Sequence, residues 1–100
     1  MTGFNVAQID DVIHGRIRLG IMVYLAQSEV ADFTTLRTAL DTTQGNLSIH
    51  LRKLEEAGYV AIDKSFLGRK PLTRARLTNA GRKALAVYVA AMAQLLEDMR

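Results

Sequence analysis

The chain has 100 residues, of which 49% are hydrophobic and 23% are charged, a composition typical of one folded domain with a modest core. It contains no cysteine, which excludes disulfides, thiolate metal sites and cysteine nucleophiles. The net charge is +3, and no stretch reaches the roughly 18 apolar residues that a membrane span needs, so we expect one cytoplasmic domain over residues 1–100 without a signal peptide.

The first predicted element is an amphipathic helix over about residues 9–26. Apolar side chains recur there at spacings of three and four residues, from Ile9 to Leu25. The second half, residues 19–25, is apolar nearly all round. We therefore expect it to be covered on two sides, by the core and by a partner surface.

Two helices joined by a short turn follow. The pattern breaks at residues 28–32, and Thr34 or Thr35 is expected to cap a short helix through about residue 40. Thr43 is expected to cap the next helix, which runs over about 43–57 and ends before Gly58. Leucines at positions 47, 51 and 54 form one apolar stripe on this helix, so the pair has the pattern of a helix-turn-helix.

A β-hairpin and a last helix complete the chain. Residues 59–67 (YVAIDKSFL) are rich in β-branched and aromatic residues, GRKP (68–71) supplies turn residues, and the return strand ends at residue 77. A helix is predicted over about 79–99, capped by Thr78 or Asn79. It carries more apolar surface than one core-facing side requires, which predicts association with a second copy.

Positive charge is concentrated in the middle of the chain. The net charge is −2 over residues 1–41, +6 over 42–83 and −1 over 84–100. A basic segment inside an otherwise neutral domain is typical of a protein that binds the phosphate backbone of a nucleic acid. On the third helix the side chains away from the leucines include Gln, Asn and Arg, which pair with base edges in the major groove.

Three segments resemble the winged-helix regulators of the MarR and ArsR type. The stretch TQGNLSIHLRKLEEAGYV (43–60) is similar to their recognition helix, and IHGRIRLGIM (13–22) is similar to their first helix. The stretch KSFLGRKPLTRARLTNAGRKAL (64–85) is similar to their wing and to the start of their last helix. Arg16 stands where these proteins often have proline, and residues 74–76 replace a threonine- and tyrosine-rich strand. The resemblance implies a mainly α fold with a small β-hairpin wing, in which a three-helix core is joined to a C-terminal dimerisation helix.

This interpretation assigns residues to three surfaces. It implies a homodimer that binds double-stranded DNA at a palindromic operator and acts as a transcriptional regulator, with repression as the expected mode. On the recognition helix the predicted DNA contacts are Thr43, Gln44, Gly45, Asn46, Ser48, Ile49, Arg52 and Lys53. On the wing they are Lys64, Arg69 and Lys70. The predicted dimer interface comprises Leu19, Met22, Tyr88, Met92, Leu95, Leu96 and Met99.

Other functions find less support in the sequence. The two histidines, His14 and His50, have no further ligands evident near them, so no metal site is expected. The carboxylates show no paired arrangement, and Gly68-Arg69-Lys70 lacks the preceding glycines of a phosphate-binding loop, so we expect no enzyme and no cofactor. The alternative is a winged helix used for protein–protein contact. Whether a small-molecule effector binds is left open.

Overall fold

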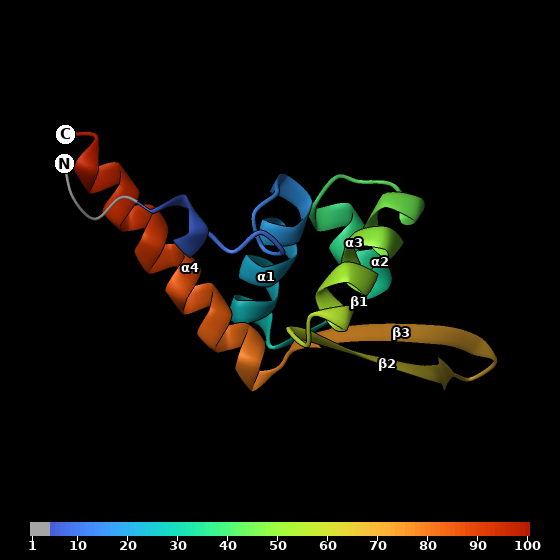
Figure 1. Ribbon diagram of the computed structural model, residues 1–100. Helices are drawn as coiled ribbons and strands as arrows, with labels where there is room; N and C mark the ends of the chain where they lie inside the picture. Colours follow the sequence, from blue (N-terminus) through green and yellow to red (C-terminus); the bar gives the residue numbers. More distant parts are fainter. Residues whose placement is uncertain (1–4) are drawn as a thin grey trace.

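The elements of the computed structural model, which describes residues 5–100, follow the order of a winged helix. They are η1 (Val6–Gln8), α1 (Arg16–Ser28), β1 (Val30–Asp32), α2 (Phe33–Ala39), α3 (Gln44–Glu56), β2 (Val60–Leu67), β3 (Lys70–Leu77) and α4 (Asn79–Asp98). The helices α1, α2 and α3 lie together above the sheet, the β2–β3 hairpin projects to one side, and α4 extends to the other (Figure 1). The molecule is therefore elongated, with extents of 58 × 25 × 21 Å. The predicted fold class is confirmed.

The core lies between α1, α3 and the base of the hairpin. The leucine stripe of α3 is buried as predicted, and it packs with Ile17, Ile21 and Leu25 of α1. Val60 and Leu77, which pair across the strands where the hairpin begins, belong to the same cluster. The packing fixes the side of α3 that faces inward, and so it also fixes the side that faces solvent.

The first helix begins seven residues later than the sequence pattern predicts, at Arg16 instead of residue 9. Oδ1 of Asp10 accepts the backbone N–H groups of Val12 (2.8 Å) and Ile13 (3.1 Å), and this holds the segment in a turn. Ile13 is nevertheless fully buried. The apolar spacing correctly reported burial there, but a turn buries these residues without a helix.

A short strand that the sequence pattern did not predict lies at residues 30–32. It pairs antiparallel with β3, Ala31 opposite Ala75, which gives a three-stranded sheet in the order β1-β3-β2. The cap of α2 also differs from the prediction of Thr34 or Thr35. Oδ1 of Asp32 accepts the N–H of Thr35 at 2.7 Å, and this hydrogen bond lowers the pKa of Asp32.

The ends of α3 and α4 are formed by the residues that the sequence singles out. Oγ1 of Thr43 accepts the N–H of Asn46 (3.1 Å), and Oγ1 of Thr78 accepts the N–H of Gly81 (2.9 Å). Helix α3 ends in a Schellman motif, in which the N–H of Tyr59 reaches the carbonyl of Leu54 and Gly58 takes a φ of 83°. These caps set where α3 begins and where the chain turns into the β2–β3 hairpin.

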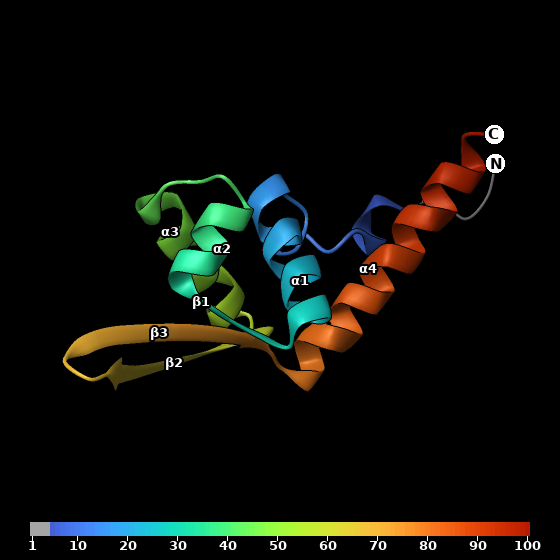
Figure 2. The same ribbon diagram turned by 180° about the vertical axis from the view of Figure 1, so that it is seen from behind.

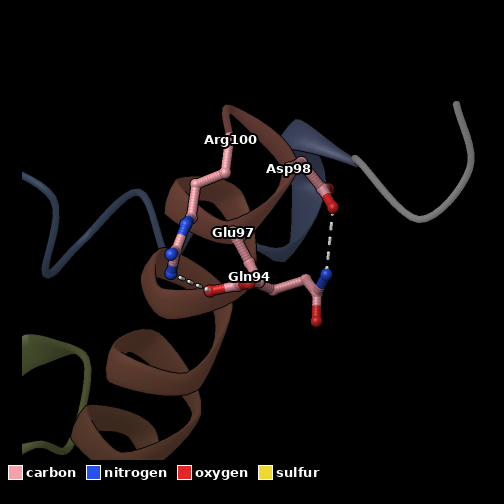
Figure 3. A network of polar contacts seen from close by, with 4 residues as sticks. All are labelled: Gln94, Glu97, Asp98 and Arg100. Atoms are coloured by element: carbon pink, nitrogen blue, oxygen red, sulfur yellow. Dashed lines mark hydrogen bonds and ion pairs between the residues drawn. The ribbon is translucent and has the colours of Figure 1, made fainter.

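The outer half of α4 leaves the body of the molecule (Figures 1 and 2). All buried residues of this helix lie in its first half, up to Tyr88. Its last turns are polar on one side, where Gln94 donates to Asp98 (3.0 Å) and Arg100 to Glu97 (3.4 Å), as Figure 3 shows. Within residues 5–100, no helix has both the length and the apolar content for crossing a bilayer.

Candidate nucleic-acid interface

The solvent side of α3 carries every residue that the sequence assigns to the recognition helix. All eight, from Thr43 to Lys53, are exposed, whereas the intervening Leu47 and Leu51 are buried. The predicted orientation of the helix is therefore confirmed. Figures 1 and 2 place α3 on the same side of the molecule as the hairpin, away from the outer half of α4.

A groove of about 770 Å³ runs between α3 and the wing. One wall is a row on α3 formed by Gln44, Ser48 and Arg52, which recur every four residues and so lie above one another on the helix. Lys64 of β2 and Thr73 of β3, which pair across the strands, face this row. The structure thus brings three recognition-helix residues and one wing residue to a single polar surface.

Two carboxylates also border the groove, Asp32 at the start of α2 and Glu55 near the end of α3. The Asp32 carboxylate already accepts the N–H that caps α2. An anion would be repelled near Glu55, so the part of the groove suited to phosphate lies between Gln44, Arg52 and Lys64.

The remaining predicted DNA contacts lie outside the groove. The solvent-exposed face of α3 outside the groove carries Asn46, Ile49 and Lys53. Arg69 and Lys70 lie at the end of the hairpin, where Gly68 takes a φ of 64° in the turn. The cations therefore fall into two groups, one beside α3 and one at the wing tip.

The N-terminus of α3 is open to a close approach. A Cβ placed on Gly45 would meet nothing within 4 Å, and Thr43 leaves free N–H groups in the first turn after capping Asn46. A helix N-terminus with exposed N–H groups and little side-chain bulk suits a phosphate or the edge of a base. The missing Cβ at position 45 leaves this end of α3 without side-chain bulk.

The inner edge of α3 is joined to α1 by a partly buried polar contact. Nη1 of Arg18 donates to Nδ1 of His50 at 2.9 Å, and Nε of Arg18 donates to the carbonyl oxygen of Val12. Partial burial lowers the pKa of His50, and the nearby charges of Arg18 and Lys53 lower it further. His50 therefore serves as a neutral acceptor that positions α3.

A second pair of contacts anchors the segment before α1. Nδ1 of His14 lies 2.9 Å from the hydroxyl of Tyr88 on α4, and the hydroxyl of Tyr59 donates to Asp10 at 2.6 Å. The bond to Asp10 raises the pKa of Tyr59. Among residues 5–100, no three His, Asp or Glu side chains gather in a way that would hold a metal ion.

The structure corrects two of the predicted interface residues. Met22 is fully buried and Tyr88 nearly so, both within the core of one copy of the chain. Their apolar surface is already covered, and neither can supply a partner surface. Leu19, Met92 and Leu95 are half-buried, while Leu96 and Met99 are exposed.

Two groove threonines escaped the sequence analysis as site residues. Thr34, in the first turn of α2, and Thr73 of β3 both line the groove. The helix-turn-helix pattern was the signal for Thr34, because it brings the start of the first helix beside the second. For Thr73 the signal was the strand register, which the sequence alone does not fix.

Comparison with known proteins places these features in context. A model of the family described as winged helix DNA-binding domain matches residues 17–96. An uncharacterized protein of Methanocaldococcus jannaschii is 34% identical over 88 residues, which cover 88% of this chain and 96% of the relative. Residues 17–96, which the family model matches, contain α3, the hairpin and most of α4.

Two solved structures share both fold and sequence features with the chain. A transcriptional regulator homologue from Pyrococcus horikoshii OT3 is 28% identical, covers 93% of each chain and superposes with a TM-score of 0.86. A protein assigned to the MarR family of transcriptional regulators, from Enterococcus faecalis V583, is 27% identical and superposes with a TM-score of 0.74. That match covers 99% of this chain and 91% of the other.

Proposed function

The chain belongs to the winged helix DNA-binding domain family and is a MarR-type regulator, and from this premise we propose that it is a homodimer that binds a palindromic DNA operator sequence-specifically. The observation that carries the proposal is the exposed row of Gln44, Ser48 and Arg52 beside the wing. Arg and Gln are side chains that read base edges in the major groove, which is wide enough to admit a helix.

In the proposed complex α3 enters the major groove with its N-terminus first. Thr43 and the free N–H groups of the first turn would contact a phosphate, and Gly45 would let the backbone approach the duplex. Gln44 and Arg52 would read bases, and Ile49, which is 56% exposed, would contact a thymine methyl group. Lys64, Arg69 and Lys70 of the wing would bind the flanking backbone.

The dimer is proposed from the exposed apolar surface of α4. Beyond Tyr88 no residue of this helix is buried, yet Val89, Leu96 and Met99 are apolar and more than half exposed. An isolated helical extension is marginal in water unless an apolar face is covered. A second copy packed along this half of α4 would cover it, and two modules related by a two-fold axis would read half-sites about one helical turn apart.

We propose that the protein acts by binding, as a repressor, and not by catalysis. A dimer seated in two successive major grooves would occlude the duplex beneath it, which would block transcription wherever the operator overlaps a promoter. The two similar structures are described as transcriptional regulators, in keeping with this role.

Selection of bound duplexes from random-sequence DNA tests the proposal. The selected sequences should share an inverted repeat, and they should compete for the protein far better than random duplex at physiological salt. Failure to enrich any sequence would contradict it. Protein contact would then be the better function for α3, with Ile49 at the centre of the contact.

A further inference from the structure

The end of the wing carries exposed apolar side chains that the fold does not use. Phe66 and Leu67 are each 71% exposed, although large apolar side chains are usually covered. No residue from Asp63 to Arg74 is buried, so this part of the hairpin contributes nothing to the core. The hairpin reaches well beyond α2 and α3 in Figure 1. Folding therefore gives no reason for a phenylalanine at this position.

The strand register places Phe66 on the groove side of the hairpin. Phe66 pairs with Pro71, Lys64 with Thr73, and Ile62 with Ala75, and paired residues share a face of the sheet. Pro71, Thr73 and Lys64 line the groove beside α3. Phe66 continues this face outward to the tip, whereas Leu67 lies on the opposite face because side chains alternate along a strand.

The tip that presents Phe66 is short and charged. Only Gly68 and Arg69 separate the strands, and the positive φ of Gly68, at the first turn position, matches the tight turns that suit a twisted hairpin. Arg69 and Lys70 follow immediately. An aromatic ring on one face of a narrow ribbon whose tip carries two cations is suited to a slot with apolar walls and anionic rims. The minor groove of DNA, lined by sugars and bordered by phosphates, has these properties.

We propose that Phe66 enters the minor groove next to each half-site and wedges against a base step, while Arg69 and Lys70 bind the phosphates on either side. This inference rests on the proposed function, because the wing reaches the duplex only when α3 is in the major groove. Apolar wedges of this kind partly unstack a step and bend the duplex. Pyrimidine–purine steps unstack most easily, so they are favoured where the ring inserts.

Charge favours the duplex over a protein as the occupant. An apolar surface on a second copy would cover Phe66, but it would leave Arg69 and Lys70 without anionic partners. The minor groove satisfies the ring and both cations together. Phe66 is thus a determinant of sequence preference at positions that α3 does not touch.

Local unstacking can be measured directly on a duplex selected by the protein from random-sequence DNA. The adenine analogue 2-aminopurine, which brightens when it is unstacked, is placed in turn at each step flanking the half-sites. The wild type is expected to raise its fluorescence at one flanking step per half-site. Phe66→Ala should abolish this rise and bind roughly tenfold more weakly. Leu67→Ala, on the opposite face of the strand, is the matched control and should retain the rise.

The outcomes separate this inference from the proposed function. If no duplex is enriched, both fail. If the wild type binds its selected duplex but brightens no flanking step, or if Phe66→Ala brightens the same step, the wedge is overturned while specific binding stands. An affinity for DNA that is unchanged in Phe66→Ala, together with weakened self-association, would assign Phe66 to a second copy instead.

Discussion

The guanidinium of Arg18 donates to Nδ1 of His50 at 2.9 Å and so joins α1 to the inner edge of the helix that carries the proposed DNA contacts. Because a guanidinium has no acceptor, the contact requires a neutral imidazole. Burial of the ring lowers the pKa of His50 below its ordinary value of 6.5, and the nearby charge of Arg18 lowers it further.

Acidification is expected to destabilise the fold through His50. The unfolded chain binds the proton more readily than the folded chain, so the free energy of unfolding should fall as the pH drops through 6.5 toward the lower pKa of the folded state. The free energy from urea unfolding should be compared at about pH 7.5 and pH 5.5 for the wild type and His50→Gln. Gln keeps an acceptor but does not titrate, so its loss over this interval should be smaller. Equal losses in the two proteins would contradict the role of His50.

Gly81→Ala should weaken the fold. A Cβ at this position would lie 2.1 Å from the carbonyl oxygen of Tyr59, which also accepts the N–H of Thr78. Since backbone lies on both sides of the clash, α4 must shift, at a cost of about 1 to 3 kcal/mol in the free energy of unfolding. Urea unfolding measures the cost. A variant as stable as the wild type would show that α4 moves away from Tyr59 easily.

Gly45→Ala is the matched substitution in open space, and it should separate binding from stability. The new Cβ meets nothing within 4 Å, so stability should be unchanged or higher by up to about 1 kcal/mol because alanine favours the helix. DNA affinity should nevertheless fall, because the methyl group would stand between α3 and the duplex. Tight binding by this variant would mean that the N-terminus of α3 stays clear of the DNA.

Replacing both Leu95 and Leu96 with Gln should produce a monomer that binds the operator weakly. These residues lie on the half of α4 that has no buried residue, and Leu96 is 59% exposed. Sedimentation of the variant should give the mass of one chain, and an intact dimer would place the interface elsewhere. Val30→Thr, at an exposed apolar residue of β1, should leave the dimer unchanged.

The sequence predicted the parts of the fold that local chemistry determines. Thr43 and Gly58 carry their own capping signals, and the leucines of α3 define one buried side. The strand at residues 30–32 was missed because three residues carry no periodic signal, and only pairing with β3 makes them a strand. The turn at Asp10 is an exception, because its hydrogen bonds to Val12 and Ile13 are local, but the helical spacing of the apolar residues around it favoured a helix.

The candidate site was predictable as a helix face but not as a groove. The positions of Gln44 and Arg52 follow from helical spacing, whereas their apposition to Lys64 depends on how the hairpin packs. Met22 and Tyr88 show the converse difficulty. An apolar residue on a helix suits a core and an interface equally well, and only the folded chain shows that these two are buried.

The most direct test of the account is the specificity ratio, the affinity for the selected duplex divided by that for random duplex, measured across a salt series. Arg52→Ala and Gln44→Ala should each lower this ratio, with Arg52→Ala costing about 1 to 3 kcal/mol on the selected site and much less on random DNA. Lys70→Ala is the control: it should weaken both duplexes alike and reduce the salt slope by about one unit per lost contact in each subunit. If Arg52→Ala and Gln44→Ala leave the ratio intact in proteins that circular dichroism shows to be folded, α3 does not read the sequence and the account is contradicted.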